Sequence, residues 1–74
     1  MNANMKITIL SAIFAQEENF DCIQIMNYIR ENEVNNKTIP HQEIAMYMDT
    51  LRGRGWIKVT DDSKEFTKFT VVLP

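Results

Sequence analysis

The chain has 74 residues, 45% of them hydrophobic and 24% charged, and its formal net charge is −2 at pH 7. This composition excludes an intrinsically disordered chain, and the length predicts one domain, residues 1–74, near the lower size limit for a self-sufficient core. No apolar run is long enough to cross a membrane, so no membrane partner is expected. The single cysteine, Cys22, cannot form an internal disulfide, which is typical of a reducing compartment and predicts a cytoplasmic protein.

The charges are distributed unevenly along the chain. Residues 1–36 hold two basic and five acidic side chains, whereas residues 37–74 hold six basic and five acidic ones. The C-terminal half is therefore mildly basic. A protein that binds DNA without sequence preference usually has a larger basic excess, because neutralised phosphates supply most of that affinity. A domain this small is often marginally stable alone, so a homodimer or a protein partner is also expected.

The first predicted helix lies within residues 5–18. Apolar side chains at helical spacing define its stripe, which consists of Ile7, Leu10, Ile13 and Phe14 and is widened by Ile9 and Ala12. This width predicts burial on more than one side of the helix. The same residues, followed by Ala15, also resemble a short signal peptide. A core helix is the favoured interpretation, because cleavage after Ala15 would leave a still smaller domain.

A second helix is predicted within residues 19–33. Asn19 or Asp21 can cap it, because a short side-chain oxygen accepts hydrogen bonds from the N–H groups of the first turn. Its apolar face is predicted from side chains that recur in three-residue steps, namely Phe20, Ile23, Met26 and Ile29.

A third helix is predicted within residues 38–55. Thr38 is the expected cap and Pro40 the expected first helical residue, where a missing N–H costs nothing. Gly53 or Gly55 is expected to end the helix, since glycine adopts the left-handed conformation easily. The predicted buried stripe consists of Ile44, Tyr47, Met48 and Leu51.

A β-hairpin is predicted from the remaining residues. Residues 56–60 and 66–73 are rich in strand formers, and residues 61–64 are turn formers. Two strands alone are unstable, so the hairpin is expected to pack on the helices. A short extra strand around Thr38 and Ile39 is expected to complete a three-stranded sheet.

Residues 43–62, EIAMYMDTLRGRGWIKVTDD, carry a more specific pattern. The stripe from Ile44 to Leu51 is followed by Gly55 and then by a strand that includes Ile57. This pattern resembles the recognition helix and wing of winged-helix regulators of the MarR and PadR kind, and residues 7–33 are similar to the PadR layout of two helices joined by a short loop. The resemblance implies an α+β fold, a winged helix-turn-helix in which three helices are followed by a two- to three-stranded β wing.

Two further expectations concern oligomerisation and DNA. MarR and PadR proteins carry extra dimerisation helices that residues 1–74 do not supply, so a homodimer would use the three helices or the wing. The resemblance implies a small transcriptional regulator that binds double-stranded DNA with its third helix in the major groove. Base contacts are expected from His41, Gln42, Met46 and Thr50, and phosphate contacts from Arg52, Arg54 and Lys64.

Each of these residues also has a purely structural interpretation. Arg52 and Arg54 complement the negative end of the helix dipole, and a lysine near a hairpin, such as Lys64, discourages aggregation. His41 at a helix start is often a solvated surface residue. Cys22 is expected to be a small, partly buried filler rather than a redox switch, because the adjacent Asp21 raises its pKa.

The alternative function is a winged-helix interaction module, acting as an adaptor, an inhibitor or a complex subunit that does not bind DNA. The acidic net charge, Met46 and Asp49 favour it, and an exposed Trp56 could anchor a protein partner, although Trp56 is expected to cover the core. An enzyme is not expected, because one histidine, one cysteine and no glycine-rich phosphate loop offer no catalytic or metal-binding pattern. No cofactor is expected.

Overall fold

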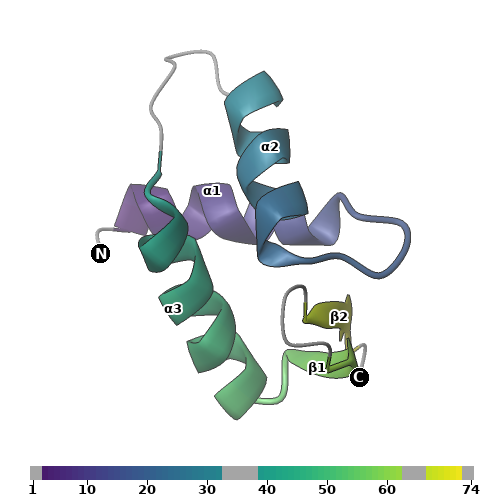
Figure 1. The fold of residues 1–74 in the computed structure, drawn as a ribbon. Coiled ribbons are helices and arrows are strands. Elements are labelled where there is room, and N and C mark those ends of the chain that lie inside the picture. Colours follow the sequence, from purple (N-terminus) through teal and green to yellow (C-terminus); the bar gives the residue numbers. More distant parts are fainter. Residues whose placement is uncertain (1–2, 33–38, 63–66, 73–74) are drawn as a thin grey trace.

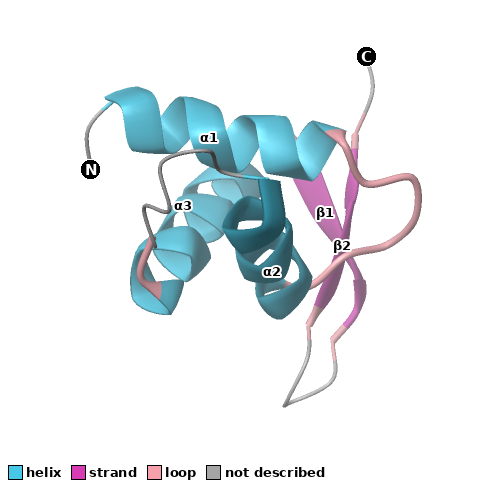
Figure 2. Cartoon of the chain, turned by 90° about the horizontal axis from the view of Figure 1, so that it is seen from above, coloured by secondary structure: helices cyan, strands magenta, loops and turns pink. Residues whose placement is uncertain are grey.

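The computed structural model describes residues 3–32, 39–62 and 67–72, and it contains three helices followed by a two-stranded antiparallel sheet (Figure 1). The elements in chain order are α1 (Ala3–Phe14), α2 (Cys22–Asn32), α3 (His41–Gly53), β1 (Ile57–Asp61) and β2 (Lys68–Val71). The predicted α+β layout is therefore confirmed. α1 packs on α2, α2 on α3, and α3 on β1, and the hairpin lies to one side of the three helices (Figure 2).

One hydrophobic core joins these elements. Its members come from every helix, from β1 and from the connections, and they are Ile9, Ala12, Ile13, Phe20, Ile25, Ile29, Ile39, Ile44, Met48, Leu51 and Ile57. Burying a side chain of this size contributes about 1.5–3 kcal/mol each before the entropic cost of ordering the chain is counted. The core thus depends on all three helices at once.

The sequence prediction for α1 is wrong in part. Ile7 and Phe14 belong to the predicted buried stripe, yet 60% and 55% of their surfaces are exposed. The buried side chains are Ile9, Ala12 and Ile13, on the opposite side of the helix. α1 is apolar on several sides, and its packing against the rest of the core, α2 included, selects the side that is buried.

α2 begins where the predicted cap places it. The Asp21 carboxylate accepts a hydrogen bond from the Gln24 N–H at 2.8 Å, and the Gln24 side chain accepts one from the Asp21 N–H at 2.9 Å. This reciprocal pair satisfies N–H groups at the helix start, as in a capping box. Asp21 is thus the cap, and Asn19 precedes it in the loop.

The predicted apolar face of α2 is correct in part: Phe20 and Ile29 lie in the core and Met26 packs against it, but the prediction includes Ile23 and omits Ile25. Ile25 and Ile29 are buried, whereas Ile23 is 37% exposed. An α-helix turns once every 3.6 residues, so side chains spaced three residues apart move gradually around it and do not stay on one face. Phe20 also lies before α2 begins. The four-residue step from Ile25 to Ile29 does stay on one face.

A third chain segment joins the hairpin, but from another place than predicted. Thr38 lies outside the described residues, and Ile39 is buried without being part of a strand. The segment that pairs with β2 is Phe20, whose N–H donates to the Phe69 carbonyl at 3.0 Å and whose carbonyl accepts from the Phe69 N–H at 2.8 Å. The two phenyl rings also stack, with centroids 6.3 Å apart.

α3 starts without a side-chain cap and ends on a well-defined turn. Pro40 is the N-cap residue, whereas the sequence predicts it as the first residue of the helix. Its carbonyl accepts a hydrogen bond from the Ile44 N–H at 3.2 Å. At the other end Gly55 has φ of 80°, and the N–H groups of Gly55 and Trp56 donate to the carbonyls of Arg52 and Leu51. These two bonds form a Schellman motif, which reverses the chain into β1.

The two strands pair with a bulge. Ile57 lies opposite Val71 and Val59 opposite Phe69, and the register shifts between Val59 and Asp61, which faces Lys68. Ile57 is buried against the helices, while the following Lys58 is exposed. The hairpin therefore presents one side to the core and the other to solvent.

A pair of substitutions on α2 tests the corrected helix face. Ile25→Ala should lower the free energy of unfolding by about 2–5 kcal/mol, because it removes a fully buried side chain. Ile23→Ala, two positions away, should change it by less than about 1 kcal/mol. Urea unfolding followed by circular dichroism measures both, and equal losses would contradict the assigned face.

Candidate nucleic-acid interface

α3 has one buried side and one exposed side. Ile44, Met48 and Leu51 enter the core, and Tyr47 is half-buried beside them, so the predicted inward stripe is confirmed apart from Tyr47. The exposed side chains are His41, Gln42, Met46, Asp49, Thr50 and Arg52. Every residue from which base contacts are expected is therefore solvent-accessible.

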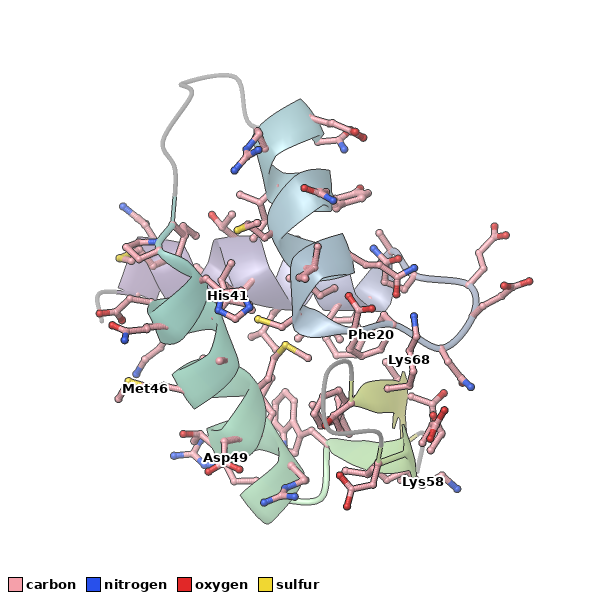
Figure 3. All side chains as sticks on the ribbon, viewed as in Figure 1. Phe20, His41, Met46, Asp49, Lys58 and Lys68 are labelled. Atoms are coloured by element: carbon pink, nitrogen blue, oxygen red, sulfur yellow. The ribbon has the colours of Figure 1, made fainter. Side chains whose placement is uncertain are left out.

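These side chains are not equivalent around the helix. The helical period places Gln42 and Asp49 near the centre of the exposed side, with His41 and Thr50 on opposite flanks. Met46 is 68% exposed, and Figure 3 shows Met46 and Asp49 projecting from the same side of α3. A carboxylate thus occupies the middle of the candidate interface.

Arg52 partly neutralises this carboxylate. Its Nη2 atom donates to Asp49 Oδ1 at 2.9 Å, one helical turn away, and both side chains are exposed. An exposed pair of this kind contributes at most about 1 kcal/mol. Little free energy therefore opposes a rearrangement in which Arg52 leaves Asp49 for another anion.

The basic residues beyond α3 have different surroundings. Arg54 is exposed at the C-cap of α3, and Lys58 is exposed on β1. Lys64 lies outside the described residues. Lys68 donates to Asp21 Oδ2 at 3.1 Å and to Gln24 Oε1 at 3.0 Å. Lys68 thus ties β2 to the start of α2, a role that sequence spacing does not reveal because the partners are far apart in the chain.

A cavity lies between the starts of α2 and α3 and the hairpin. Its volume is about 340 Å³, and its lining includes Cys22 and His41. The Cys22 thiol donates a hydrogen bond to the backbone carbonyl of His41, with Sγ and the oxygen 3.8 Å apart. Partial burial, and to a lesser extent the charge of Asp21, raises the pKa of the Cys22 thiol to about 11. The thiol is thus protonated at neutral pH, which fits the expected role of a small filler.

The prediction that Trp56 covers the core is wrong. Instead of covering the core, it is 47% exposed directly after the Schellman turn, while its carbonyl accepts from the Val72 N–H at 2.9 Å. The backbone of Trp56 thus continues the pairing of the hairpin, and its indole is accessible beside the C-terminal end of α3.

Comparison of the chain with protein-family models, with curated protein sequences and with solved structures finds no match. Among the described helices, none has both the length and the apolar character needed to cross a membrane. Within the same described residues, no three His, Cys, Asp or Glu side chains lie close enough together to hold a metal ion.

The Cys22 environment gives a testable pH dependence. Alkylation of the folded protein by iodoacetamide requires the thiolate, so its rate should rise with a midpoint near pH 11 rather than at the ordinary value of 9.0. The free energy of unfolding should fall as the pH rises from 9.0 to about 11, because the thiol of the unfolded chain ionises at a lower pH than that of the folded chain. Asp21→Asn should lower the midpoint, and a wild-type midpoint below 9.0 would contradict the assignment.

Proposed function

We propose that this chain is a winged helix-turn-helix protein that binds double-stranded DNA through α3, as a small cytoplasmic transcriptional regulator. The observation that carries the proposal is the free side of α3. This helix of 13 residues is held by one side only, and its opposite side is accessible along its whole length. A helix of that length spans about 20 Å, which suits the major groove of B-DNA.

The surroundings of α3 support the same proposal. α2 packs against α3, and the hairpin extends from the C-terminal end of α3 in the place of a wing (Figure 1). The pairing of Phe20 with β2 supports a three-stranded wing sheet. The connection between α2 and α3, residues 33–40, departs from simple helix-turn-helix proteins, in which a turn of about three to four residues joins the two helices.

The side chains on α3 suit a sequence-dependent contact better than a purely electrostatic one. Gln42 can bind adenine with two hydrogen bonds, and Met46 can contact the methyl group of thymine. Arg52 and Arg54 at the C-terminal end would bind phosphates and set the orientation of the helix. Asp49 would repel phosphates, so the affinity for random DNA should be low.

Replacing two arginines at the end of α3 tests the phosphate contacts. Arg52→Ala combined with Arg54→Ala should reduce affinity for duplex DNA on the order of tenfold or more and reduce the slope of log affinity against log salt by about two. Arg30→Glu changes the net charge by the same amount but lies on the last turn of α2, so it should leave binding unchanged. Fluorescence anisotropy with labelled duplex DNA at several salt concentrations measures all three proteins.

A gain of affinity should follow from the opposite change. Asp49→Asn removes the central carboxylate and releases Arg52, so binding to duplex DNA should strengthen severalfold. Wild-type protein and this variant both failing to bind DNA at low salt would overturn the proposal.

A second candidate function is a protein-interaction module that uses the same surface. Two observations favour it. The apolar side chains of Met46 and Trp56 are exposed, and the exposed carboxylate of Asp49 on the same side of α3 as Met46 would repel DNA. Exposed apolar and aromatic residues often become the centre of a protein interface.

Oxidative footprinting tests this second candidate. In the isolated protein Met46 should be oxidised rapidly and the buried Met48 slowly, because they differ in exposure. A protein partner in cell extract should protect both Met46 and Trp56. Unchanged labelling of both residues in extract would count against an interaction module.

A further inference from the structure

The outer side of α1 carries an apolar stripe that the core does not use. Ile7 and Phe14 are 60% and 55% exposed, and Leu10 between them is half-buried. Steps of three and four residues place these side chains on one side of the helix, opposite Ile9 and Ala12. Figure 2 shows α1 along one edge of the molecule, with α2 and α3 on its inner side. The stripe therefore faces outward.

A groove borders this stripe. Its volume is about 250 Å³, and it lies between α1 and α2, with Ile7, Thr8, Ser11, Tyr28, Ile29 and Asn32 as its lining. This volume is several times that of one water molecule, so a side chain from outside can enter. The small side chain of Ser11 leaves room for a second helix to approach closely.

The two ends of α1 carry opposite charges. Lys6 is exposed near the start of α1, and Glu17 and Glu18 are exposed just beyond its end, while α1 itself holds no acidic residue. A second α1 laid in the antiparallel direction would bring Lys6 of each copy close to the glutamates of the other. A parallel copy would instead place like charges together, which is unfavourable.

From these three features we infer that the exposed side of α1 is a homodimer interface, in which two copies pack antiparallel about a two-fold axis. In this arrangement Ile7 of each copy lies opposite Phe14 of the other, and Leu10 lies opposite Ser11. Phe14 of the second copy thus reaches the groove beside Ile7, and the apolar stripe is removed from water in both copies. The inference does not depend on DNA binding, because it uses none of the side chains on the exposed side of α3.

Sedimentation equilibrium over a concentration series tests this interface. The wild-type chain should associate to a dimer, and Ile7→Glu combined with Phe14→Glu should raise the dimer dissociation constant at least on the order of tenfold. Met46→Glu introduces one negative charge at an exposed apolar residue on α3, outside the inferred interface, so it should leave the dissociation constant unchanged. Circular dichroism checks that each variant keeps its helical content.

Charge exchange tests the direction of packing while leaving the apolar stripe intact. Lys6→Glu should weaken the dimer, and Lys6→Glu combined with Glu17→Lys and Glu18→Lys should restore it, because the antiparallel arrangement pairs opposite charges again. A parallel dimer would show no such rescue, and that result would overturn the inferred geometry. A monomer at every accessible concentration, or a dimer insensitive to the changes at Ile7 and Phe14, would overturn the interface itself.

Discussion

The backbone pairing of Phe20 with Phe69 ties the hairpin to the segment that precedes α2. A two-stranded hairpin is not stable in water alone, and the pairing gives β2 a second neighbour while it buries the Phe20 side chain in the core. The next residue, Asp21, caps α2 and binds Lys68 of β2. Two consecutive residues thus fix both the start of a helix and the position of the sheet. These contacts join the sheet directly to the start of α2.

The second constraint is the reversal of the chain after α3. Gly55 supplies the left-handed conformation, and the hydrogen bonds of the Schellman motif direct the chain from the helix into β1 without an extended loop. Because Ile57 is buried directly after this turn, β1 is anchored against the same core as α3. The exposed side of α3 and Arg54 at its C-cap are therefore held in a fixed position relative to the hairpin, as the proposed DNA-binding function would require.

Two exposed surfaces of different character result from this architecture. The surface on α3 is mixed, with Gln42, Met46 and Asp49 at its centre and basic residues at its end. The surface on α1 is apolar along its length and charged only at its two ends. The first suits a partner with hydrogen-bonding groups and charge, and the second suits a self-complementary contact. The dimer inferred from the α1 surface would stabilise the folded chain by mass action, and with it the surface on α3.

Local sequence by itself determined much of the secondary structure of this protein. The α2 cap at Asp21, the end of α3 near Gly53 and Gly55, the inward stripe of α3 and the succession of helices and strands all follow from hydrogen bonds and periodicity within a few residues. Only the tertiary structure decided which side of α1 and α2 enters the core, that the loop before α2 pairs with β2, and that a lysine of β2 is paired with the α2 cap. These features depend on contacts between residues far apart in the chain. A helix that is apolar on several sides can pack into a core in more than one orientation, so its own sequence does not decide which side is buried.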